Sequence, residues 1–336
     1  MTVVRKKREK IDLLDLIDCC ISLTVEKKRD CGEDSEKHSF NIDEAFFGVF
    51  DGCGGAGAQP CPKCRGKTEA YIASRVVADS FQEWFENREE STVRDADTLK
   101  ELVVGYLNEC NKQVGEKSLL VGGIKKKFPT TAAAGICRPG TDSVEVDFYW
   151  AGDSRVYLLN DQGLAQLTED DLGGIDAMEN LTDDGVLTNV ISLSKDFTIH
   201  TGHISMDRPG IVFAATDGCF GYLSTPMEFE FLLLKTMLEA DCISLSSDND
   251  TKAGGRKKGW QEKITEVIGK IAGDDYTLSG YAIGFGSFEE MKKRFVPRAN
   301  YLYSNYIAGL ENKSYEEKIT LWEKYRSDYY RLLCMG

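Results

Sequence analysis

Some apolar stretches of the chain have the pattern of β-strands and others have the period of α-helices, so the sequence predicts an α+β protein. Residues 20–25 alternate apolar and polar side chains, which is the period of a half-buried strand. The aromatic run 46–50 is short, continuous and followed by glycines, as is typical of a buried strand. The same texture predicts further strands at residues 131–137, 144–151, 155–160, 211–216 and 278–285.

Helical periodicity separates these strands. Apolar side chains recur on one face of residues 68–85 and of residues 98–117, so both segments are expected to cover a sheet. Pro226 begins a third predicted helix, which continues to about residue 240, and a fourth covers residues 261–271. The tyrosine-rich residues 287–336 are predicted to be helical and to pack on the domain, because exposed aromatics at this density would aggregate.

These patterns predict one main domain with an extension at each end. We expect an N-terminal extension over residues 1–17, a catalytic domain over 18–286 and a helical C-terminal extension over 287–336. Residues 169–198 are acidic, rich in glycine and weakly periodic, which favours a flap-like insertion.

Composition narrows the class of protein. The 336 residues carry a formal net charge of −14 at pH 7, which argues against a nucleic-acid-binding surface. The 11 cysteines are scattered without framework spacing, so reduced thiols are expected. Three aspartates interrupt the apolar stretch 11–23, which is therefore neither a signal peptide nor a membrane span. We expect a monomer that is soluble and cytoplasmic and has no membrane partner.

Acidic residues with a glycine within two positions recur at the ends of predicted strands. They are Asp34, Asp51, Asp153, Asp217 and Asp275. One such residue is an ordinary turn, but five in one chain predict a shared cation site at one end of a sheet. The chain has only 3 histidines, so oxygen ligands and Mg²⁺ or Mn²⁺ are favoured over zinc. Two such ions would activate a bridging water toward phosphorus, and Arg29 would bind the phosphate.

Taken together and in order, the motifs resemble the metal-dependent protein phosphatases of type 2C, the PPM family. The family's Gly-Asp-Ser-Arg motif is intact at residues 152–155, and its Ala-Thr-Asp-Gly motif is intact at 215–218. Its Asp-Gly-His-Gly-Gly motif resembles residues 51–55, and its Thr-Thr-Ala strand matches 130–132. Its acidic N-terminal motif resembles Arg29 with Glu33 and Asp34, and its closing Asp-Asn element resembles Asp275-Tyr276. The resemblance covers roughly residues 18–286.

The resemblance implies a four-layer α-β-β-α sandwich of two antiparallel sheets flanked by helices, with a metal site at one end between the sheets. Asp51 would bridge two metals with help from the Gly52 carbonyl. The other ligands implied are Asp217 and Asp275 on the first metal, Glu33 on the second through water, and Asp153 with Asp217 on a weaker third metal near Asp34. The implied reaction is one-step hydrolysis of phosphoserine or phosphothreonine in a phosphoprotein, without a phosphoenzyme, in opposition to a serine/threonine kinase.

Two departures from the family pattern leave an alternative open. Cys53 stands where the family has a His that is thought to protonate the leaving alkoxide, and Tyr276 replaces an Asn. A positioned general acid contributes about 10²–10⁴-fold, so we expect slow turnover of phosphoserine and phosphothreonine. The alternative is a weak or inactive relative that binds phosphoproteins or regulates a partner. Cys61 and Cys64 resemble half of a zinc site, but no second pair follows at zinc-finger spacing.

Overall fold

The computed structural model describes residues 13–87, 95–114, 127–173, 176–182, 185–242 and 258–333. Most of the predicted N-terminal extension, and much of the polar loop before residue 259, lie outside these residues. Among the described helices, none combines the length and the apolar character needed to span a bilayer.

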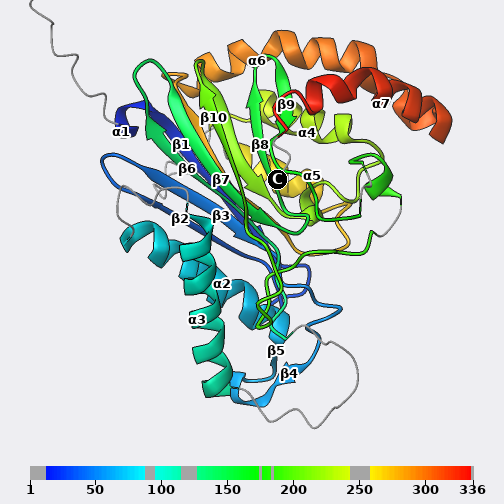
Figure 1. Ribbon diagram of the computed structural model, residues 1–336. Helices are drawn as coiled ribbons and strands as arrows, with labels where there is room; N and C mark the ends of the chain where they lie inside the picture. The colour runs from blue at the N-terminus through cyan, green and yellow to red at the C-terminus, as the bar shows by residue number, and fades with distance from the viewer. Residues whose placement is uncertain are drawn as a thin grey trace, which may run out of the picture.

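Two antiparallel five-stranded sheets form the centre of the molecule (Figure 1). In spatial order, the first sheet contains β1 (Ile17–Val25), β12 (Tyr276–Ile283), β11 (Gly210–Ala215), β8 (Arg155–Asn160) and β9 (Gly163–Gln166). The second contains β10 (His200–Met206), β7 (Val144–Ala151), β6 (Ala132–Pro139), β3 (Ala45–Phe50) and β2 (Ser35–Phe40). A small hairpin of β4 (Pro60–Cys61) and β5 (Lys67–Thr68) stands apart from both sheets.

Helices cover the outer face of each sheet. The second sheet is covered by α2 (Glu69–Asn87) and α3 (Ala96–Val114). The first is covered by α4 (Pro226–Glu239), α5 (Trp260–Ile268), α6 (Phe288–Leu302) and α7 (Tyr315–Tyr329), as Figure 1 shows. The short α1 (Leu13–Leu16) leads into β1. The layers are therefore helix, sheet, sheet and helix, as the sequence predicts.

The alternation of side chains along β3 shows how the layers are held together. All six residues of β3 are buried, so the strand has no solvent-facing side. Phe46 and Phe50 pack among the side chains of α2 and α3, whereas Phe47 and Val49 pack between the two sheets. Successive side chains of a strand point to opposite faces, so a continuous apolar run fits a strand that is covered on both sides.

Three strands of the two large sheets were not predicted from the sequence: β2, β9 and β10. Each lies at the edge of its sheet, and β2 and β10 carry polar residues along much of their length. An edge strand of this kind is only partly covered, so it needs no continuous apolar run. Residues 160–163 form the tight connection between β8 and β9.

Candidate active site

The predicted acidic residues gather at one end of the sandwich. Asp51 follows β3, Asp153 follows β7, and Asp217 follows β11. Asp34 directly precedes β2, whose first residue, Ser35, pairs with the last residue of β3. In the same way, the start of β12 pairs with the end of β11. Antiparallel pairing thus brings strand beginnings and strand ends to the same edge.

The Asp51 turn is fixed by its main chain. The Asp51 carbonyl oxygen accepts hydrogen bonds from the Thr131 amide at 2.8 Å and from the Thr130 hydroxyl at 2.7 Å. A side chain at Gly52 would place a Cβ 2.4 Å from the Ala70 carbonyl oxygen, so only glycine fits there. Burial raises the pKa of Asp51 well above its usual value, and the negative charges of nearby carboxyl groups, first among them Asp34, add to this effect.

Asp34 and Asp217 belong to the same cluster. The Thr216 hydroxyl donates to Asp34 Oδ2 at 2.8 Å and accepts from the Thr277 amide at 2.9 Å, which links Asp34 to β11 and β12. Burial raises the pKa of Asp34 to about 7, against the opposing effect of these hydroxyl contacts. Burial also raises the pKa of Asp217, and the charge of Asp274 is the next cause.

Asp153 sits in the turn between β7 and β8. Gly152 has φ +98°, a conformation that favours glycine, and it packs against Thr131. The Ser154 and Thr131 hydroxyls lie 2.7 Å apart, which ties this turn to the strand beside Asp51. Burial, followed by the charge of Asp217, raises the pKa of Asp153 to about 8. The pKa of Asp153 is therefore raised, like the pKa values of the other aspartates, by burial and by the neighbouring negative charges.

The Asp275 carboxylate binds main-chain amides of a remote loop. Asp275 Oδ1 accepts from the Lys27 amide at 2.6 Å, and Oδ2 accepts from the Glu33 amide at 2.7 Å. The carboxylate thereby holds both ends of the loop 27–33, which carries Arg29 and Glu33. As a metal ligand, Asp275 stays a prediction.

Asp274 is the acidic residue that the sequence analysis missed. It is exposed, unlike Asp275, and its charge raises the pKa of both Asp217 and Glu33. The sequence alone cannot assign different roles to two adjacent aspartates. Their orientations depend on the residue at which β12 begins.

Glu33 and Arg29 differ in how firmly they are held. The Glu33 carboxylate packs against Gly54 and accepts a hydrogen bond from the Thr68 hydroxyl at the end of β5. Burial raises the pKa of Glu33 despite that hydrogen bond. The Arg29 side chain is 95% exposed, and its Nε lies 3.7 Å from Asp30 Oδ2. A guanidinium in so open a position can turn toward an incoming anion at small cost.

Cys53 lies beside Asp51, as the motif requires. Its amide donates to the Pro129 carbonyl at 3.1 Å, and its side chain adds to the negative field that raises the pKa of Asp51. The predicted role of Cys53 as a proton donor stays a prediction.

The chemistry of these donors fits a hard divalent cation. Buried carboxylates with raised pKa values are costly unless a positive charge neutralises them. The nearest buried guanidinium, Arg155, is occupied by Asp170, which it binds through Nε at 2.9 Å and through a terminal nitrogen at 2.6 Å. Within the described residues, no three His, Cys, Asp or Glu side chains form a ready metal-binding group. The fit therefore rests on donor chemistry and burial.

The Cys61 and Cys64 turn lies outside this cluster. The Cys61 thiol donates to the Val114 carbonyl at 3.7 Å, and Cys64 and Cys110 pack in the same apolar region. The described residues contain no metal-binding group here either. The turn is therefore a contact between the β4–β5 hairpin and the end of α3.

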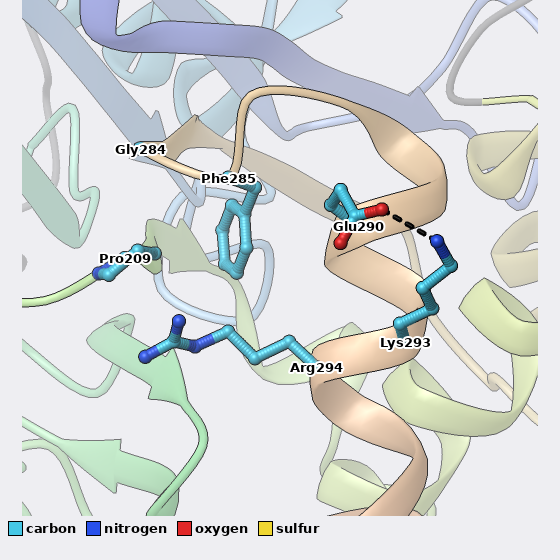
Figure 2. A pocket seen from close by; sticks show the side chains of 6 residues that line it. All are labelled: Pro209, Gly284, Phe285, Glu290, Lys293 and Arg294. Carbon is cyan, nitrogen blue, oxygen red and sulfur yellow. Dashed lines mark hydrogen bonds and ion pairs between the residues drawn. The ribbon is translucent and has the colours of Figure 1, made fainter.

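A pocket of about 340 Å³ lies at the other end of the sandwich, where β12 ends and β11 begins (Figure 2). Its cationic groups are paired: Lys293 donates to Glu290 at 2.6 Å, and Arg294 donates to Asp161 at 3.0 Å. The pocket shares no residue with the carboxylate cluster, so the acidic end is the better candidate for phosphate chemistry.

Comparison with known proteins identifies the fold. No protein-family model matches the chain, and no curated protein matches it in sequence. The fold is that of serine/threonine phosphatases, among them a PPM phosphatase, and the predicted α+β four-layer sandwich is confirmed.

Three solved structures illustrate the match. Serine/threonine phosphatase Stp1 from Staphylococcus aureus has a TM-score of 0.57 and 16% identity, over 83% of this chain and 99% of that one. The S. agalactiae serine/threonine phosphatase has a TM-score of 0.51 and 17% identity, over 79% and 98%. The PPM Ser-Thr phosphatase MsPP from Mycobacterium smegmatis, in complex with cacodylate, has a TM-score of 0.50 and 15% identity, over 80% and 100%.

Proposed function

We propose that this protein is a Mg²⁺- or Mn²⁺-dependent protein phosphatase of the PPM type that hydrolyses phosphoserine and phosphothreonine. The observation that supports it is the cluster of Asp34, Asp51, Asp153 and Asp217, whose pKa values are all raised, on the fold of serine/threonine phosphatases. Its substrate would be a phosphoprotein made by a serine/threonine kinase, and we place it in the cytoplasm as a monomer.

The proposed ligands are oxygen donors at this end of the sandwich. Asp51, the Gly52 carbonyl and Asp217 would hold the first two ions, and we propose Asp274 as a ligand in place of the predicted Asp275. Glu33 would act on the second ion through water, and Asp153 and Asp34 would serve a third. Such ions supply charge neutralisation and an activated water nucleophile at neutral pH.

The chain's own residues would bind and orient the substrate. Arg29 can take a phosphate through two parallel hydrogen bonds, and its loop is held in place by the Asp275 carboxylate. The Thr68 hydroxyl and the Glu33 carboxylate fix the other side of that loop. Cys53 would face the leaving oxygen, because it lies beside Asp51.

The experiment is phosphate release in Mn²⁺ from an aryl phosphate and from a phosphothreonine peptide. Asp217→Asn is expected to lower kcat/KM on both substrates by about 100-fold or more, the scale of losing a key electrostatic group. The control is Asp161→Asn, at the opposite end of the sandwich, which should leave kcat/KM unchanged. The proposal is overturned by wild-type protein that releases no phosphate in Mn²⁺ or by equal activity in Asp217→Asn.

The second candidate function, a weak or inactive phosphatase-like binding protein, is favoured by Cys53. A serine or threonine alkoxide needs a proton as it leaves, whereas an aryl oxide is stable without one. Cys53→His is therefore expected to raise turnover of the phosphothreonine peptide by about 10- to 100-fold and to change aryl phosphate turnover little. Phosphopeptide binding without turnover, in wild type and Cys53→His alike, would establish the second candidate.

A further inference from the structure

Asp171 joins three separate segments at the edge of the acidic site. Its Oδ2 accepts hydrogen bonds from the Gly152 amide at 2.8 Å and from Asn189 Nδ2 at 2.7 Å. Its Oδ1 lies 3.0 Å from His200 Nε2 at the start of β10. The Asp171 amide in turn donates to the Gly152 carbonyl at 3.0 Å, so the two residues are bonded in both directions.

The same residue closes the predicted flap at its base. The Asp171 carbonyl accepts from the Thr188 amide at 2.9 Å and from the Thr188 hydroxyl at 3.0 Å. Asn189 also bonds to the main chain of Thr198, through its side-chain oxygen at 3.0 Å and its nitrogen at 2.9 Å. Residues 171, 188–189 and 198 are thereby tied together.

His200 completes this arrangement and is itself held. Its ring stacks on Trp150 in the neighbouring strand β7, with ring centres 5.0 Å apart. Trp150 Nε1 donates to the carbonyl of Glu169, the first residue of the flap, at 2.8 Å. The Asp171 carboxylate therefore contacts the His200 ring, whose position is fixed by β10 and by its stacking on Trp150.

The position of Gly152 makes these contacts relevant to the site. Gly152 immediately precedes Asp153, and its left-handed conformation sets the direction in which the Asp153 side chain leaves the turn. The neighbouring Asp170 cannot take over the role of Asp171, because Arg155 binds it through two nitrogens.

We propose that Asp171, supported by His200, is a positioning residue that orients Asp153 toward its cation and fastens both ends of the flap beside it. The proposal rests on the function proposed above, in which Asp153 serves a metal. Carboxylates and histidines behind metal ligands change metal affinity by about 10- to 100-fold when they are removed.

The experiment measures amide hydrogen exchange without metal and Mn²⁺ binding by calorimetry, in full-length Asp171→Ala, Asp171→Asn and His200→Gln. Asp171→Ala is expected to speed exchange about tenfold in peptides that cover residues 150–157 and 185–192, because the Gly152 amide loses its carboxylate partner and the Asn189 side chain loses its hydrogen bond to Oδ2. It should weaken the weakest Mn²⁺ binding step by about tenfold or more. Asp171→Asn keeps one acceptor oxygen and should restore most of both.

His203→Gln is the matched control. His203 lies on the same strand, β10, and also bonds to carboxylates, with Nδ1 2.9 Å from Asp147 and Nε2 2.9 Å from Glu145. It should leave exchange in the two peptides unchanged, whereas His200→Gln should raise it.

Three results would overturn the proposal. They are unchanged exchange in Asp171→Ala, an equal effect of His203→Gln and His200→Gln, and Mn²⁺ binding in Asp171→Ala as tight as in the wild type. A wild type that binds Mn²⁺ but hydrolyses no phosphate ester would end the proposed function and still leave the exchange and binding results to decide on Asp171. A wild type that binds no Mn²⁺ would overturn both.

Discussion

At the scale of single residues, the site separates groups that the sequence cannot tell apart. Asp274 and Asp275 are adjacent and both acidic, yet only Asp275 bonds to the amides of Lys27 and Glu33. The charge of Asp274 instead raises the pKa of Asp217. The Asp275 carboxylate holds a loop, whereas Asp274 acts on Asp217 through its charge.

Substitution by alanine at each position tests this division. Asp275→Ala removes two main-chain acceptors and should lower the free energy of unfolding by about 3 kcal/mol. Asp274→Ala should change the free energy of unfolding by less than about 0.5 kcal/mol, because the residue is exposed, but it should raise the Mn²⁺ concentration that activates phosphate release. Urea unfolding and Mn²⁺ titration measure the two effects. The opposite pattern would return the ligand role to Asp275.

Some residues of the site could be predicted from the sequence, and others could not, because their roles arise from different kinds of contact. Asp51 and Asp217 could be located from sequence, because each follows a continuous apolar run that must be a buried strand. The loop-holding role of Asp275 and the role of Asp171 could not be recognised, since both depend on main-chain amides from remote segments. Such contacts leave no periodic signal in the chain.

At the scale of elements, the inner strands of both large sheets were predictable, whereas β1 is the one edge strand of these sheets that was predicted. The bounds of β7 and β8 agree with their apolar runs, whereas β2, β9 and β10 lie at sheet edges. The two C-terminal helices pack on α4 through an aromatic cluster that includes Trp322, Tyr325 and Tyr329. Arg155 also reaches this cluster, with a terminal nitrogen 3.3 Å from the Tyr329 hydroxyl.

A buried ion pair links α6 to α4. Glu230 is fully buried, and Arg298 binds it through Nε at 2.6 Å and a terminal nitrogen at 3.0 Å. Arg298→Ala leaves the Glu230 charge buried without its guanidinium and should cost about 3–5 kcal/mol in urea unfolding. Arg294→Ala, on the same helix, breaks a more exposed pair with Asp161 and should cost less than about 1 kcal/mol. Equal costs would show that the pair does not anchor α6.

At the scale of the whole molecule, the layers bring negative charge together at one end. Three strand ends and two strand beginnings carry carboxyl groups to this edge, in a chain with a net charge of −14. The apolar core between the sheets keeps the cluster partly out of water, which is why the pKa values rise. The fold therefore gathers buried carboxyl groups whose negative charge a bound cation would neutralise.

Stability should consequently depend on pH and on divalent cations. Burial raises the pKa of Asp34 to about 7 and that of Asp153 to about 8, whereas an unfolded chain loses these protons near pH 4. Between these values the folded state holds more protons than the unfolded state, so without divalent cations the free energy of unfolding falls as pH rises from about 4 to about 8.

Mn²⁺ should offset this loss. At pH 8, a concentration of about 100 times the Kd should raise the Tm by about 5–10 °C, and the gain should shrink toward pH 5 as the ligands take up protons. Thermal unfolding in EDTA and in Mn²⁺ measures both trends, with Asp217→Asn as the comparison. A Tm in EDTA that rises between pH 5 and pH 8 would contradict the raised pKa values.

The most direct test of the account is anomalous diffraction at the manganese edge from crystals grown with Mn²⁺. The account predicts at least two manganese peaks between the sheets, bound by Asp51 and Asp217, with Asp274 rather than Asp275 as a further ligand. Crystals that hold no manganese among these carboxylates, or hold it only elsewhere on the molecule, would contradict the proposal that this acidic cluster is a catalytic metal site.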